Sequence, residues 1–253
     1  MNPPTEDVGA APLAVLLAAV AGSVDGVCFV TLYQMFVAHM SGNSAALGVD
    51  LAMAQWPAAL ARFFPIPLFV LGTILGALLY EHLRRRNVQR RLSIVLVIEG
   101  TLLAIFALWG STIESNGQLP RDPAWRFFIL AAMPVLAVAL QNATLHRVGH
   151  ASVHTTFVTG ILSSFADGVA KSIYMLADLR KGGASFVTAL QQTRQAPQAA
   201  QAVLFAGIWL AYLAGAGSGA WLHTRAGLAA LILPLIGIGT AVLLDVFRPV
   251  HPE

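Results

Sequence analysis

The sequence predicts an all-α polytopic membrane protein, and two observations lead to this fold class. Of the 253 residues, 57% are hydrophobic and only 11% are charged, whereas a soluble domain carries about 25% charged residues. Six apolar stretches also reach the length of roughly 20 residues that a helix needs to cross the bilayer core. Fifteen Lys and Arg with twelve Asp and Glu residues are too few to cover a water-soluble globule. This composition excludes most soluble enzymes and nucleic-acid-binding proteins.

The predicted spans follow one another along a single integral membrane domain, residues 1–253. They cover about residues 11–33, 61–80, 92–110, 127–145, 200–222 and 227–247. Two further stretches, at about 41–54 and 155–176, are shorter or more polar. We expect them to form membrane-depth helices at the SGN and TG motifs, and the sequence leaves open whether they fully cross.

The distribution of basic residues selects the topology, because Lys and Arg near span ends stay on the cytoplasmic side. If the two shorter stretches do not cross, eleven basic residues lie on the side of both termini and four on the other side. If both cross, the count becomes seven on each side. The sequence therefore predicts six spans with both termini in the cytoplasm. Residues 18–23 (AAVAGS) resemble a signal-peptidase site, but residues 1–7 carry two acids and no Lys or Arg, so we expect the segment to be retained as the first helix.

The two halves of the chain share a pattern of polar and small residues, which indicates an internal repeat. Asp25 lies 17 residues before Gly42 of the MSGN motif. Asn142 lies 18 residues before Gly160 of the FVTG motif. A GxxxGAxL motif also occurs late in the second span of each half.

Each half contains three spans, so the second copy enters the membrane from the opposite side. The sequence therefore predicts a 3+3 inverted repeat. Repeat 1 covers about 11–110 and repeat 2 about 127–247, with a cytoplasmic insertion at about 178–201.

Three segments resemble a known family. They are GSVDGVCFVTLYQMFVAHMSGN (22–43), LQNATLHR (140–147) and VHTTFVTGIL (153–162). In these segments the chain resembles the YoaK family of bacterial membrane proteins, and the resemblance covers nearly the whole chain. It implies a multi-pass protein of the bacterial cytoplasmic (inner) membrane with about six spans. The resemblance does not indicate which substrate is bound, and it supplies no catalytic residues that could be assigned to this chain.

Polar residues inside the apolar stretches are the candidates for function, because charged groups in a bilayer are costly. Inverted-repeat transporters place broken helices at the midplane, where the two copies meet around a substrate. The predicted substrate or ion site draws on both halves: Asp25, Ser41, Gly42, Asn43, Gln141, Asn142, Thr155, Thr156, Thr159 and Gly160. The alternative is that these residues have a purely structural role. The Ser and Thr hydroxyls would then cap helices, and the Asp, Asn and Gln side chains would form hydrogen bonds to neighbouring helices.

Three further residues are predicted as proton-coupling groups: Glu99, Asp167 and His39. Glu99 lies near the centre of the third span. Its position is consistent with two roles, a proton relay or a buried acid that is simply hydrogen-bonded. Asp167 lies four residues before Lys171, and an ion pair on one helix face explains both without any function. His39 lies directly before the MSGN motif.

These patterns predict a small-molecule or ion transporter, with a noncatalytic structural or regulatory membrane component as the alternative. No GxSxG or HExxH motif is present, and we expect no catalytic residue, no cofactor and no bound metal. The expected partners are the lipid bilayer and an unknown small molecule or ion, not nucleic acid. GxxxG motifs allow helices to approach closely. We expect them to pack within the chain or to form an oligomer contact, through Gly72 and Gly76 or through Gly215 and Gly219.

Overall fold

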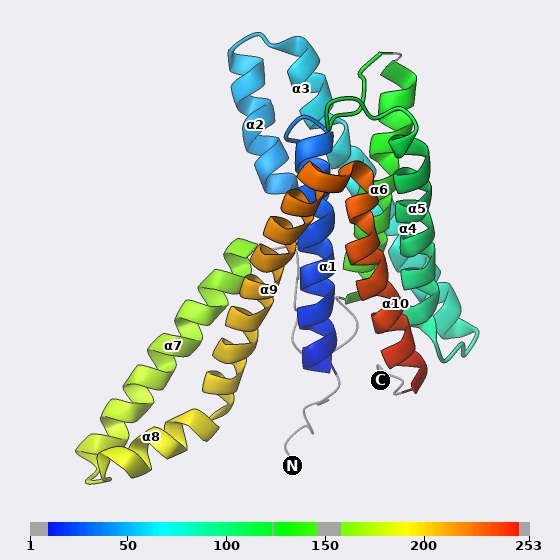
Figure 1. Cartoon of the computed structure of the whole chain (residues 1–253). Helices are drawn as coiled ribbons and strands as arrows, with labels where there is room; N and C mark the ends of the chain where they lie inside the picture. Colours follow the sequence, from blue (N-terminus) through cyan, green and yellow to red (C-terminus); the bar gives the residue numbers. More distant parts are fainter. Residues whose placement is uncertain (1–9, 123, 146–157, 248–253) are drawn as a thin grey trace.

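The computed structural model describes residues 10–122, 124–145 and 158–247, which contain helices and loops but no β-strand (Figure 1). This confirms the all-helical prediction. The helices in chain order are α1 (Ala10–Thr31), α2 (Met40–Ala52), α3 (Trp56–Phe63), α4 (Pro65–Arg85), α5 (Arg91–Ser111), α6 (Ala124–Leu145), α7 (Val158–Lys181), α8 (Phe186–Gln195), α9 (Pro197–Ala226), the 3₁₀ helix η1 (Gly227–Leu231) and α10 (Ile232–Phe247).

Within the described residues, five helical stretches are long and apolar enough to cross a membrane, as expected for a multi-pass membrane protein. Four of them contain α1, α3 with α4, α5 and α6. The fifth, Pro197–Phe247, contains α9, η1 and α10. Figure 1 shows the chain reversing direction at η1, so this stretch holds the last two predicted spans as an antiparallel pair. The helices α2 and α7 are not among the five stretches.

The reversal between α9 and α10 begins at Gly227. Its φ of +57° lies in the left-handed region, which glycine adopts without a steric penalty. The residues that follow form η1 rather than an α-helix, and α10 begins only at Ile232. The last span was predicted to begin at about residue 227, but its α-helix begins at Ile232, after the 3₁₀ helix η1.

The insertion predicted at 178–201 is mostly helical. The end of α7 extends into it, α8 lies within it, and α9 begins at Pro197. Ser185 caps α8, since its hydroxyl oxygen accepts the backbone N–H of Thr188 at 3.2 Å. Proline is preorganised for the first turn of a helix, so α9 begins earlier than predicted from apolar residues alone. The arm formed by α7 and α8 projects from the bundle at the end opposite α2 and α3 (Figure 1).

The closest helix pair in the bundle is α1 with α9. A Cβ added at Gly215 of α9 would lie 2.1 Å from the carbonyl oxygen of Ala19 on α1. A Cβ added at Gly22 of α1 would lie 2.1 Å from the carbonyl oxygen of Tyr212 on α9. The two backbones therefore touch without intervening side chains, which is the contact that small residues permit in membranes.

The GxxxG motif of α4 makes a similar contact with α6. A Cβ at Gly72 would lie 2.7 Å from the Cβ of Ala139, and one at Gly76 would lie 2.9 Å from the Cβ of Ala143. Both GxxxG motifs thus pack against helices of the same chain, and the faces considered for an oligomer contact are occupied there.

The main apolar core fills the space between α1, α5, α6, η1 and α10. At one end of this core Asp245 of α10 joins the first turn of α5. Its carboxylate accepts the backbone N–H of Ser93 at 3.1 Å and also the Ser93 hydroxyl. An N–H in the first turn has no partner within its own helix, so Asp245 supplies that partner from another helix.

Candidate functional site

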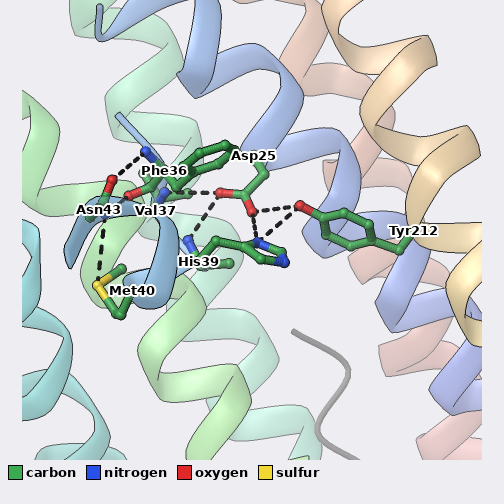
Figure 2. A network of polar contacts seen from close by, with 8 residues as sticks. Asp25, Phe36, Val37, His39, Met40, Asn43 and Tyr212 are labelled. Carbon is green, nitrogen blue, oxygen red and sulfur yellow. Dashed lines mark hydrogen bonds and ion pairs between the residues drawn. The ribbon is translucent and has the colours of Figure 1, made fainter. Parts of the chain in front are cut away.

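The candidate site lies where α1 ends and the chain turns back toward α2. Tyr33 and Gln34 have φ values of +55° and +62°, so two consecutive residues in the left-handed region sharply redirect the backbone after α1. The segment that follows returns past the side chain of Asp25 before α2 begins at Met40 (Figure 2). This turn brings backbone N–H groups to a carboxylate in the interior of α1.

Asp25 is only 1% exposed and has a hydrogen-bond partner on each side of its carboxylate. Its Oδ1 accepts the backbone N–H groups of Val37 at 2.9 Å and Ala38 at 3.0 Å. Its Oδ2 lies 2.7 Å from Nδ1 of His39 and accepts the phenol O–H of Tyr212 at 2.7 Å (Figure 2). One carboxylate thus joins α1, the loop before α2, and α9.

His39 has a defined hydrogen-bonding pattern in this cluster. An ionised carboxylate can only accept hydrogen bonds, so the short contact between Nδ1 of His39 and an ionised Asp25 places a proton on Nδ1. The His39 side chain remains 19% exposed, against 2% for Asp25. The imidazole is therefore accessible from outside the cluster, whereas the Asp25 carboxylate is not.

Asn43, another predicted site residue, is fully buried and binds its own chain. Its Nδ2 donates to the carbonyl oxygen of Phe36 at 2.7 Å, and its Oδ1 accepts the Phe36 N–H at 3.1 Å. A Cβ added at Gly42 would lie 3.1 Å from the Phe36 ring, whereas Ser41 is exposed. Ser41, Gly42 and Asn43 were predicted to help bind a substrate or ion. The N–H groups of the preceding segment do bind a carboxylate, but that carboxylate is Asp25.

The second half of the predicted site is not among the described hydrogen-bond partners of Asp25. Gln141 and Asn142 are buried near the end of α6, and among the described residues neither amide atom of Gln141 has a hydrogen-bond partner. Thr159 is exposed and Gly160 half-buried in the first turn of α7. Thr155 and Thr156, which complete the predicted set, lie outside the described residues. The described contacts of Asp25 come from repeat 1 and from Tyr212.

The three predicted proton-coupling groups lie in three different settings. His39 belongs to the Asp25 cluster. Asp167 binds Lys171 at 2.6 Å, as the spacing predicts, and both side chains are more than 60% exposed. This ion pair lines an open groove of about 400 Å³ between α7 and α9. Glu99 is fully buried, and neither of its carboxyl oxygens has a hydrogen-bond partner in the part of the chain that the structure describes.

Tyr212 was not predicted from the sequence, although a signal for it was present. Tyr212 lies three and seven residues before Gly215 and Gly219, so it shares the α9 face that the GxxxG motif turns toward α1. A phenol on a helix face that packs this closely on α1 is within reach of the acid on α1.

A second histidine–carboxylate cluster was also missed. Nε2 of His223 lies 2.8 Å from Oε1 of Glu114 and 2.9 Å from the hydroxyl oxygen of Thr31. The other Glu114 oxygen accepts the backbone N–H of Leu228 at 2.9 Å. This cluster joins the end of α1, the loop after α5, the end of α9 and η1. Glu114 and His223 lie near predicted span ends, where polar residues are common, so their types and positions gave no signal.

Replacing Asn43 by alanine is expected to lower the free energy of unfolding by about 1–3 kcal/mol, because the N–H and carbonyl of Phe36 lose their partner. Unfolding in mixed micelles with increasing SDS, followed by circular dichroism, measures this change. Ser41→Ala in the same motif is the control, since Ser41 is exposed. Equal stabilities of the two variants would contradict a bracing role for Asn43.

Comparison with curated proteins gives no match, and neither does comparison with solved structures. A family match covers residues 13–244 and is consistent with the resemblance to the YoaK family, without establishing that name. This match extends over nearly all of the helical bundle described above, including the Asp25 cluster. The chain belongs to the family described as protein of unknown function (DUF1275).

Proposed function

We propose that this chain transports a small molecule or ion across the bacterial cytoplasmic membrane, and that the Asp25–His39–Tyr212 cluster is its proton-responsive element. The observation that carries the proposal is the partly exposed His39 bonded to a buried carboxylate on α1. A histidine whose charge changes near neutral pH is a common proton switch. Because the same carboxylate holds Tyr212 of α9, a change at His39 acts on the contact between the two halves of the chain.

The packing of the helices supports two inverted repeats. If α1, α4 and α5 correspond to α6, α9 and α10, the α1–α9 pair has the α6–α4 pair as its counterpart. Both pairs are present, and both are made through GxxxG motifs. The α5–α6 contact likewise has its counterpart in α10–α1. In Figure 1 each helix of the first set runs opposite to its counterpart.

The arrangement of the bundle ends supports the predicted orientation. The start of α1, the end of α10, the connection from α4 to α5 and the arm of α7 and α8 all lie at one end in Figure 1. This end carries most of the basic residues, and such ends face the cytoplasm. Both termini are therefore proposed to be cytoplasmic.

A second function, a noncatalytic structural or regulatory component, is favoured by a different observation. Asp25 and Asn43 use their hydrogen-bonding atoms on the chain's own backbone and side chains. A cluster that only stabilises the fold would show the same hydrogen bonds. The experiment must therefore separate ligand response from stability.

The test uses purified protein in proteoliposomes and a panel of probes: sodium, potassium, phosphate, lactate, succinate, glutamate and glucose. Charge movement on a solid-supported membrane and the shift in Tm are recorded at pH values on either side of about 6.5, the ordinary pKa of histidine. We expect one probe class to give a current and a higher Tm in the wild type. In His39→Gln the Tm shift should persist while its pH dependence is lost.

His82→Gln is the matched control, because it makes the same substitution at an exposed histidine in the last turns of α4. It should respond to the probes as the wild type does. If no probe changes the current or the Tm of the folded wild type, the noncatalytic function replaces the transporter. If a probe is transported with the same pH dependence in His39→Gln, the proton-responsive role of the cluster is wrong.

A further inference from the structure

Glu99 of α5 is an acid that the Asp25 cluster does not use. It is 0% exposed, and neither carboxyl oxygen has a hydrogen-bond partner among the described residues. Its helix face is otherwise apolar: Leu92, Leu96, Leu103 and Phe106 are buried at positions three, four or seven residues away. The carboxyl group therefore projects into the apolar core with no polar group bound to it.

No cation on the neighbouring helices is available to neutralise Glu99. The helices α4, α6, α10 and η1 pack against α5. On α10 the one titratable side chain is Asp245, which binds Ser93. On α6 the one titratable side chain is Arg126. It lies in the first turn of that helix, over the ring of Trp125. η1 has no titratable side chain.

The charged groups of α4 lie at its end, outside the core. Glu81 there forms ion pairs with Arg84 and Arg85, while His82 lies beside them in the last turns of the helix. Tyr80 lies next to this group, with Arg91 over its ring. None of these residues forms an ion pair with Glu99.

An ionised carboxylate without a partner in such a core costs far more than a neutral carboxylic acid. We propose that Glu99 is a proton-binding site inside the bundle, distinct from the Asp25 cluster. Its carboxyl carries a proton in the structure described here and exchanges it when water reaches the core. The ligand of this site is the proton itself, and the inference does not depend on transport of any other substrate.

Infrared difference spectroscopy tests the protonation directly, because protonated and ionised carboxyl groups absorb in separate regions. Wild type and Glu99→Gln are compared in proteoliposomes at neutral pH. We expect the wild type to show a protonated-carboxyl C=O band that Glu99→Gln lacks and that Asp25→Asn retains. Loss of carboxylate bands in Glu99→Gln, in place of the C=O band, would show that Glu99 is ionised and would overturn the proposal.

Exchange of the proton is a separate readout. After transfer to D₂O the C=O band assigned to Glu99 should shift to lower frequency in the folded protein. A band that does not shift while most backbone amides exchange would identify a permanently sealed acid, which is not an exchanging site. If Glu99→Gln does not fold, ¹³C labelling of glutamate carboxyls in the wild type gives the same measurement, since a band that stays unshifted on labelling would exclude Glu99.

Discussion

Replacing Gly215 by alanine is expected to lower the free energy of unfolding by about 3 kcal/mol or more, which is at the upper end of the cost of overpacking a core. The added methyl group would lie 2.1 Å from the carbonyl oxygen of Ala19. Both groups belong to helix backbones, so no side chain can rotate away and α1 must separate from α9. Unfolding in SDS, together with size-exclusion chromatography, measures the loss.

Gly217→Ala is a close control on the same helix. A Cβ at Gly217 has nothing within 4 Å, and alanine has the higher helix propensity by up to about 1 kcal/mol. This variant is therefore expected to be as stable as the wild type or more stable. Gly72→Ala should fall between the two, since its new methyl group meets a side chain, the Cβ of Ala139, at 2.7 Å. A loss at Gly217 as large as the one at Gly215 would show that the α1–α9 contact does not determine the effect.

Replacing Asp25 by alanine is expected to cost about 3–5 kcal/mol, the range found when one member of a buried charged pair is removed. The N–H groups of Val37 and Ala38 and the hydroxyl of Tyr212 then lose their acceptor. Hydrogen exchange provides a local readout beside the global one. The amides of Val37 and Ala38 should exchange much faster in the variant than in the wild type.

Two conservative variants separate the contributions of the individual Asp25 hydrogen bonds to stability. Asn at position 25 keeps an oxygen for the two N–H groups but loses the charge, so Asp25→Asn should cost less than Asp25→Ala. Tyr212→Phe removes one hydrogen bond to Asp25 and should cost about 1 kcal/mol. If Asp25→Ala lowers stability by less than Tyr212→Phe does, the carboxylate does not hold the cluster together.

Most helices could be predicted because the bilayer leaves few alternatives. Backbone groups inside a membrane must bond within the chain, so a long apolar stretch becomes a helix. α1, α5 and α6 accordingly lie within a few residues of the predicted spans. The start of α9 was harder to place, because it lies before the apolar stretch and depends on Pro197. Local chemistry of that kind does not appear in a hydropathy pattern.

Single residues of the site could be predicted, but their partners could not. Asp25, His39 and Asn43 stand out because they are polar residues in or beside apolar helices. Their bonds depend on the turn at Tyr33 and Gln34, whose left-handed backbone was not expected for these residue types. Glu99 was expected either to relay protons or to be hydrogen-bonded. That it has no hydrogen-bond partner among the described residues could be found only in the folded bundle.

The sequence by itself determined that this chain is a helical membrane protein and which acids lie within its apolar helices, because hydropathy and charge act locally along the chain. Only the tertiary structure decided that Asp25 binds Tyr212, which lies 187 residues away. It also decided that Asn43 braces its own loop and that no described residue forms a hydrogen bond with Glu99. Hydrogen bonds form between groups that packing brings within about 3 Å of each other, and in this chain close glycine contacts between distant helices decide which groups meet.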